Sequence, residues 1–160
     1  ETGEPPSDWG AAFDSISICL SKGLGAPVGS LLLGDAGFIK KARRLRKVMG
    51  GGMRQAGYLA AAGLYALKNN ADRLAIDNER ARKIGAILAT KDYVESVRPV
   101  QSNIVIFDLA GEITAADFLE KLEGKGILGV AFGPQTIRLT FHLDVTEEMM
   151  GRVEDILENW

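Results

Sequence analysis

Cysteine and histidine are the scarcest reactive residues in this sequence. Its 160 residues contain one cysteine, Cys19, and one histidine, His142. A lone cysteine excludes an internal disulfide, and the apolar neighbours of Cys19 predict a buried or half-buried thiol without a catalytic role. His142 is interpreted as structural, and no metal site is predicted.

A long apolar run and a targeting segment are also missing. The nearest approach, Tyr58–Leu67, is too short for a membrane span and too interrupted by glycine for a signal peptide. These absences predict a cytoplasmic protein with no membrane contact. The opening stretch "ETGEPPSDWG" has no initiator methionine and reads as a loop, which predicts that the chain is cut from a longer one.

Strong net charge is absent as well. The formal net charge of −2 argues against broad nucleic-acid affinity, although six of the eight residues from Lys40 to Lys47 are cations. Ile39, Ala42 and Met49 follow helical spacing there. The cations are therefore predicted to line the solvated side of an amphipathic helix.

What is present is a mixture of strand and helix patterns in a chain that is 46% hydrophobic, enough for a sizeable core. Two short, buried strands of apolar residues are predicted on either side of a glycine-rich loop, at 15–20 and 29–35. Helical patterns follow them at 36–49, 54–70 and 71–92. We expect the two strands to be only the edge of a larger, parallel sheet.

The pattern changes after Asp92 to short strand-like pieces with two helices between them. The strands are predicted within 94–100, 102–110, 127–133 and 136–143, and the helices at 114–126 and 146–160. We therefore predict an α/β chain with two domains. Residues 1–91 form the end of a larger domain with a linking helix, and residues 92–160 form a small α/β domain.

Lys22 is the first candidate for chemistry, because it stands at the end of the first strand and before the loop "GLGAPVG". The glycine spacing is wrong for a dinucleotide site, and a strand follows instead of a helix. A partly desolvated lysine amine is a nucleophile for an aldehyde, and pyridoxal phosphate is a common partner. The alternative is a solvated lysine.

Two arginines are further candidates. Arg54 follows the triple glycine of "MGGGMRQAG", where free amides ahead of a helix can hold an anion; the alternative is a flexible hinge between helices. Arg138, in "TIRLTFH", projects from a strand beside apolar neighbours and suits a carboxylate. An interdomain salt bridge is the alternative for Arg138.

Three segments, "FDSISICLSKGLGAPVGSLLLG", "RRLRKVMGGGMRQAGYLAAAGLYAL" and "IRLTFHLDVT", together resemble the low-specificity L-threonine aldolases. The resemblance covers nearly the whole chain in order. It implies a fold-type-I, PLP-dependent transferase-like α/β fold, with the end of the large-domain sheet and the small C-terminal domain. The implied cofactor is pyridoxal 5′-phosphate.

The resemblance also implies roles for individual residues. Lys22 matches the Schiff-base lysine, and Ser21 lies beside it near the cofactor phosphate. Arg54 and Lys47 match residues that approach the phosphate and the active site, from a neighbouring subunit. Arg138 matches the arginine that binds the substrate carboxylate.

The implied reaction cleaves a β-hydroxy-α-amino acid to glycine and an aldehyde. The histidine that stacks on the cofactor, the acid at its pyridine nitrogen and the main phosphate-binding turn belong to the family's N-terminal half, which is absent here. The expected partners are therefore that N-terminal half, further copies in a dimer or tetramer, and an amino-acid substrate. The alternatives are another lyase or aminotransferase of the same fold, or a non-catalytic fragment.

Overall fold

The computed structural model describes residues 2–160, and the chain separates into two compact units, Thr2–Asp72 and Arg73–Trp160. Each unit is described by itself. In the part of the chain described, no helix has the length and apolar character needed to cross a membrane.

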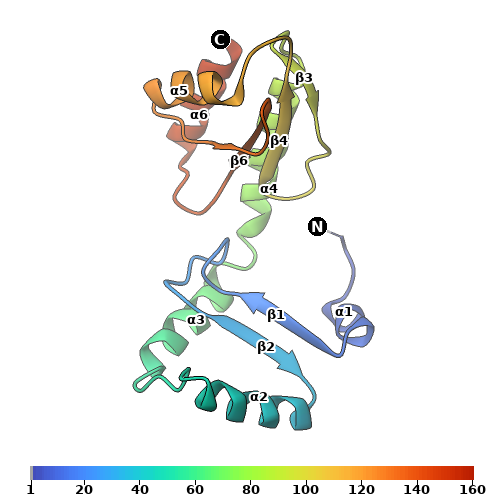
Figure 1. Ribbon diagram of the computed structural model, residues 1–160, viewed down its shortest axis with the longest axis vertical. Helices are drawn as coiled ribbons and strands as arrows, with labels where there is room; N and C mark the ends of the chain where they lie inside the picture. The colour runs from blue at the N-terminus through green and yellow to red at the C-terminus, as the bar shows by residue number, and fades with distance from the viewer. Residues whose placement is uncertain (1) are drawn as a thin grey trace. The chain divides into compact units, whose positions relative to one another are not determined.

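The first unit is a two-stranded sheet with helices. Strands β1 (Ser15–Cys19) and β2 (Ser30–Gly34) pair antiparallel, with Ile18 opposite Leu31 (Figure 1). The parallel pairing expected of the larger sheet is therefore not found between these two strands. The helices of this unit are α1 (Pro6–Ala12), α2 (Ala36–Val48) and α3 (Gly57–Asn69). The Asp35 side chain caps α2 by accepting from the Phe38 amide at 2.9 Å.

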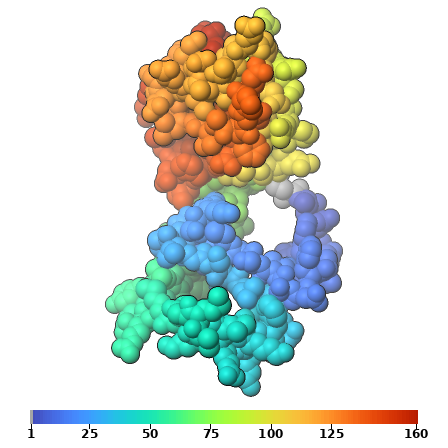
Figure 2. Space-filling model, viewed as in Figure 1, coloured from blue at the N-terminus to red at the C-terminus, as the bar shows by residue number. Residues whose placement is uncertain are grey.

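Burial in the first unit is confined to the loop after β1 and the face of α3 that it covers. The apolar residues buried there are Leu20, Leu24, Ala26 and Ala66. All of β2 is exposed, so the prediction of two buried strands is wrong for the described chain, because a sheet of two strands has too little cover. Figure 2 shows the α2 segment, coloured teal, at the surface of this unit.

The second unit is a four-stranded antiparallel sheet in the order β3-β4-β6-β5. Its strands are β3 (Val94–Val97), β4 (Ile104–Leu109), β5 (Val130–Ala131) and β6 (Thr136–Thr140). Its helices are α4 (Leu74–Leu88), α5 (Ala115–Gly124) and α6 (Glu147–Glu158). Threonines cap two of these helices, Thr114 for α5 and Thr146 for α6.

The core of the second unit lies between one face of this sheet and the three helices. Alternate residues of β4 and β6 point into it, because side chains on a strand alternate between the two faces. The buried cluster comprises Ala81, Ile84, Leu88, Val105, Phe107, Leu109, Ala115, Phe118, Leu122, Ile137, Leu139, Phe141, Met150 and Leu157. Residues between these on β4 and β6 lie on the other, open face.

Helix α4 belongs to the core of the second unit. Its buried residues Ala81, Ile84 and Leu88 pack in the same cluster as β4 and α6. The compact units accordingly divide after Asp72, ahead of the predicted domain boundary after Lys91. That boundary remains a prediction for the larger domain of the whole protein.

Gly85 generates a prediction about this core. A β-carbon on Gly85 would lie 2.7 Å from Val100 Cγ2, whereas one on Gly151, in α6, would meet nothing within 4 Å. We expect Gly85→Ala to lower the free energy of unfolding by about 1–3 kcal/mol through overpacking. Gly151→Ala, the matched control, should raise it by up to about 1 kcal/mol through helix propensity.

Urea denaturation of the purified protein measures both changes. Val100→Ala removes the methyl groups that the new side chain would meet, so its cost should be smaller in the Gly85→Ala background than in the wild type. Strictly additive free energies for the two substitutions would contradict the close contact.

Candidate functional site

The loop between β1 and β2 presents Lys22 at its surface. Three backbone hydrogen bonds close the loop: Leu20 N to Gly29 O at 2.9 Å, Ala26 N to Leu20 O at 2.9 Å and Gly25 N to Lys22 O at 2.8 Å. Gly25 and Gly29 have φ of 71° and 117°, in the left-handed region that favours glycine. The loop glycines therefore serve the turn that carries Lys22.

The same loop is anchored to α3. Leu20 and Leu24 are buried, and the side-chain amide of Asn70 donates to Leu24 O at 2.8 Å just after α3 ends. Lys22 itself is exposed, so the described residues alone do not form the desolvated pocket that the sequence suggested. Any such pocket needs residues beyond those described.

Ser21 contacts the half-buried thiol of Cys19 beside Lys22. Cys19 Sγ and Ser21 Oγ are 3.5 Å apart. The hydrogen bond with Ser21 and, to a smaller extent, the charge of Lys22 hold the pKa of Cys19 below its usual value.

The triple glycine ends helix α2 with a Schellman motif. The Gly51 amide donates to Arg46 O at 2.8 Å and the Gly50 amide to Lys47 O at 3.2 Å, while Gly50 adopts φ of 85°. The prediction of free amides is therefore wrong for Gly50 and Gly51, because both cap α2. Gly52 leaves room for Lys47: a β-carbon there would lie 2.5 Å from Lys47 Cδ and 2.9 Å from its Nζ.

Arg54 and Lys22 belong to opposite ends of α3. Arg54 is exposed and precedes the first residue of α3, Gly57, whereas the Lys22 loop is tied to Asn70 beyond its last residue. A helix of 13 residues is about 20 Å long. One copy of the chain therefore does not bring these two predicted site residues together.

Arg138 lies on the open face of the sheet of the second unit. It is on β6, opposite Ile106 of β4 and Val130 of β5. Its guanidinium carbon lies 5.8 Å from the centre of the Phe132 ring, a cation–π distance. Its Nε atom is buried without a hydrogen-bond partner among residues 2–160. A guanidinium fork left in this state suits an incoming carboxylate.

Sequence reasoning missed the polar group next to Arg138. Asp108 of β4 accepts hydrogen bonds from Thr136 Oγ1 at 2.5 Å and from Ser96 Oγ at 3.1 Å. A signal was present in the sequence, since Asp108 is the one charged residue in the strand pattern "SNIVIFDLA". These three residues come from three adjacent strands.

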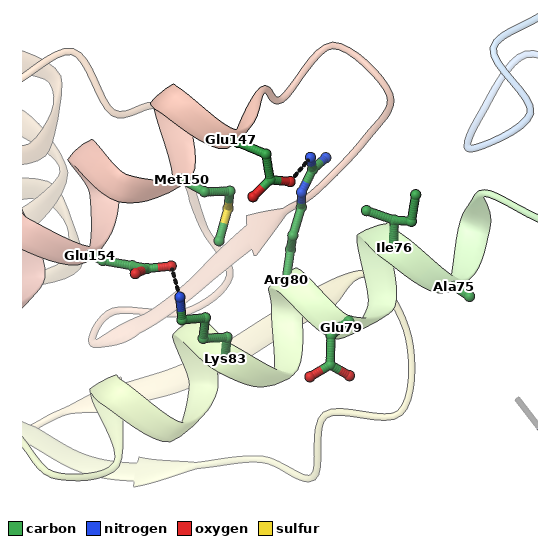
Figure 3. A pocket seen from close by; sticks show the side chains of 8 residues that line it. All are labelled: Ala75, Ile76, Glu79, Arg80, Lys83, Glu147, Met150 and Glu154. Atoms are coloured by element: carbon green, nitrogen blue, oxygen red, sulfur yellow. Dashed lines mark hydrogen bonds and ion pairs between the residues drawn. The ribbon is translucent and has the colours of Figure 1, made fainter.

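A groove of about 390 Å³ lies between α4 and α6, and none of the predicted site residues lines it. Figure 3 shows two ion pairs across it, Arg80 with Glu147 and Lys83 with Glu154, the latter at 2.7 Å. Its remaining walls include Ile76 and Met150. Because four of its five charged side chains are paired across it, we interpret the groove as part of the helix packing.

Lys22, Lys47, Arg54 and Arg138 share one property. Within residues 2–160, none of them has a carboxylate partner, whereas Arg73, Arg80 and Lys83 do. A cationic side chain of this kind can bind a phosphate or a carboxylate, and the exposed primary amine of Lys22 can react with an aldehyde.

Comparison with known proteins gives one family and several relatives. The family model described as beta-eliminating lyase matches residues 1–112. The low specificity L-threonine aldolase of Escherichia coli (strain K12) is 46% identical over 142 residues, which are 88% of this chain and 40% of that protein. The chain thus spans about 40% of the length of this relative.

Two solved structures share the fold. A protein of Exiguobacterium sp. 255-15, described as an aromatic amino acid beta-eliminating lyase/threonine aldolase, superposes with a TM-score of 0.76 at 22% identity, covering 98% of this chain and 47% of that one. Serine palmitoyltransferase of Sphingomonas wittichii gives 0.69 at 18% identity, covering 93% and 40%. These likenesses confirm the predicted fold-type-I α/β class.

Proposed function

Because the chain belongs to the beta-eliminating lyase family, we propose that the protein is a pyridoxal-phosphate-dependent aldolase of β-hydroxy-α-amino acids. Its reaction converts L-threonine and L-allo-threonine to glycine and acetaldehyde. The supporting observation is the 46% identity to a low specificity L-threonine aldolase. A match over 88% of 160 residues cannot miss the span from Ser21 to Arg138, which holds every proposed site residue.

The residues of this chain fit the cofactor. When bound, pyridoxal phosphate supplies an aldehyde that bonds to an amine and a ring that accepts the electron pair released at Cα. Lys22 provides an exposed primary amine at the end of β1. Ser21 beside it, with Lys47 and Arg54 from a neighbouring copy, supplies hydroxyl and cationic donors for the phosphate.

Arg138 is the proposed carboxylate-binding residue. Binding of the substrate carboxylate to its guanidinium fixes the amino acid, so that one bond at Cα is held in the reactive orientation. In the overall reaction the Cα–Cβ bond breaks, the β-hydroxyl loses its proton and Cα gains one. The base that accepts the hydroxyl proton is not assigned to this chain.

The first unit supports the proposed partners. Helices α2 and α3 and their ends leave large apolar side chains in water, with Met49, just after α2, 84% exposed and Tyr58, in α3, 82% exposed in the described chain. Exposed apolar area on this scale marks a surface that other protein covers. We propose that the N-terminal half of the enzyme and further copies of the chain cover it.

The reaction and Lys22 can be tested together. We expect the purified holoenzyme to release acetaldehyde from L-threonine and L-allo-threonine. Borohydride reduction followed by peptide mapping should place the cofactor on Lys22, and Lys22→Ala should abolish both signals. Mapping to Lys40 or Lys91 would contradict the site, and transfer of the amino group to a keto acid would favour an aminotransferase.

Arg138→Ala should weaken the binding of glycine by roughly 1.5–3 kcal/mol, the value of a hydrogen bond to a charged group. Cofactor affinity should stay unchanged, because the proposed phosphate ligands lie elsewhere. Spectral titration with glycine measures the first quantity and dialysis of the holoenzyme the second. Wild-type glycine affinity in this variant would make Arg138 a structural residue.

Arg54→Ala should weaken cofactor binding. A partner chain with an intact Arg54 should restore the lost activity. If Arg54 serves the site of a neighbour, a dimer of one Lys22→Ala and one Arg54→Ala chain contains one complete site. Co-refolding the two variants in equal amounts should restore about a quarter of the wild-type aldolase activity, because half of the randomly formed dimers are hybrids. Activity no higher than that of the separate variants would mean that Arg54 serves the active site of its own chain or lies outside the active site.

A further inference from the structure

Asp108 is the acidic residue nearest in register to Arg138 on the open face of the sheet. Asp108 is opposite Thr136, and Ile106 is opposite Arg138. Asp108 and Arg138 are therefore diagonal neighbours on adjacent strands, a separation of about 7–8 Å that a long side chain can span. Yet no ion pair joins them, and the guanidinium of Arg138 has no carboxylate partner within residues 2–160.

Two hydroxyl groups donate to the carboxylate of Asp108. Thr136 Oγ1 donates to Asp108 Oδ1 at 2.5 Å, and Ser96 Oγ donates to Oδ2 at 3.1 Å. Each carboxylate oxygen thus accepts from a hydroxyl of a neighbouring strand, Thr136 on β6 and Ser96 on β3. The hydrogen bond from Thr136 is the main reason that the pKa of Asp108 lies below its usual value, with smaller help from Ser96 and Arg98. Asp108 is therefore charged at neutral pH.

The β5–β6 turn sets the position of the Thr136 hydroxyl. Thr136 O accepts from the amides of Phe132 at 2.8 Å and Gly133 at 3.3 Å. A β-carbon on Gly133 would lie 2.9 Å from Thr136 Oγ1, so glycine leaves the space that this hydroxyl occupies. Phe132, on the same turn, lies against the guanidinium of Arg138. The β5–β6 turn thus places Phe132 against Arg138 and leaves space for the Thr136 hydroxyl that binds Asp108.

We propose that Thr136 and Ser96 are positioning residues: they hold the Asp108 carboxylate away from Arg138 and so keep the guanidinium available for the carboxylate of the amino-acid substrate. This inference rests on the proposed function, in which Arg138 binds that carboxylate. Released from its hydroxyl donors, Asp108 becomes an internal competitor tethered to the site at a high effective concentration.

Thr136→Val tests the proposal, since valine keeps the shape and the β-branch of threonine and removes the hydroxyl. In the full-length holoenzyme we expect KM for L-threonine to rise about tenfold with kcat nearly unchanged, the loss typical of a competing charge-assisted interaction. Thr140→Val is the matched control, because Thr140 is exposed on the same face of β6 and opposite Ile104. Its KM should match the wild type.

Asp108→Asn in the Thr136→Val background separates competition from structural damage. A neutral amide competes poorly for a guanidinium, so this second substitution should return KM to within about twofold of the wild-type value. Damage to the sheet would not be repaired by exchanging the Asp108 carboxylate for an amide. Ser96→Ala, with and without Asp108→Asn, gives the same comparison at an exposed position should Thr136→Val fold poorly.

The failures of this proposal and of the proposed function are distinguishable. If Arg138→Ala leaves KM unchanged, the carboxylate-binding role of Arg138 is wrong. If Arg138→Ala raises KM but Thr136→Val behaves like Thr140→Val, or Asp108→Asn fails to restore KM, the restraint of Asp108 is overturned. In the Arg138→Ala background, Thr136→Val should have no further effect on KM.

Discussion

The second unit depends on one buried carboxylate, that of Asp77 in the first turn of α4. Its side chain is fully buried, and Arg73 donates to both of its oxygens at 2.7 and 3.0 Å. Arg80, 3.7 Å from the same carboxylate, also donates to Val145 O at 2.6 Å and pairs with Glu147. Removing one partner of a buried charge typically costs 3–5 kcal/mol, so this network ties α4 to the start of α6. The sheet that carries Arg138 packs beneath both helices.

The two faces of that sheet carry different kinds of side chain, apolar on the inner face and partly polar on the open face. The inner face is filled by apolar side chains such as Phe107 and Ile137, which fix the register of β4 and β6 because a slip by one residue would expose them. That register in turn decides which polar residues become neighbours on the open face. The relation between Asp108, Thr136 and Arg138 is thus a consequence of apolar packing on the other side of the strands.

Local patterns in the sequence predicted most elements, and contacts between distant residues set the rest. The helix expected at 36–49 is observed as Ala36–Val48, and the strand around Arg138 is observed at Thr136–Thr140, because periodicity and end signals are local. The exposure of β2 and the division after Asp72 depend instead on which segments cover one another. The sequence alone also could not show that two of the three consecutive glycines cap α2.

Candidate site residues could be named from the sequence, and their roles remain predictions, whereas their arrangement could not be predicted. Residue chemistry and a family resemblance were enough to name Lys22, Arg54 and Arg138. The separation of Arg54 from Lys22 by the length of α3 requires the fold. Ser96 and Thr136 gave no signal, because a hydroxyl that binds a carboxylate across two strands looks like any other strand threonine or serine until the register is known.

Trp160 and helix α6 contact residues that are synthesised well before them, which affects how the second unit folds during synthesis. Trp160 packs against Phe118 with ring centres 4.5 Å apart and the rings tilted, and Leu157 O accepts from the Tyr93 hydroxyl at 3.3 Å. Ribosomes add about 5–20 residues per second, so several seconds pass between the synthesis of Tyr93 and Phe118 and that of these partners. During that interval the helix-facing side of the sheet lacks α6, so part of its apolar surface stays exposed to water.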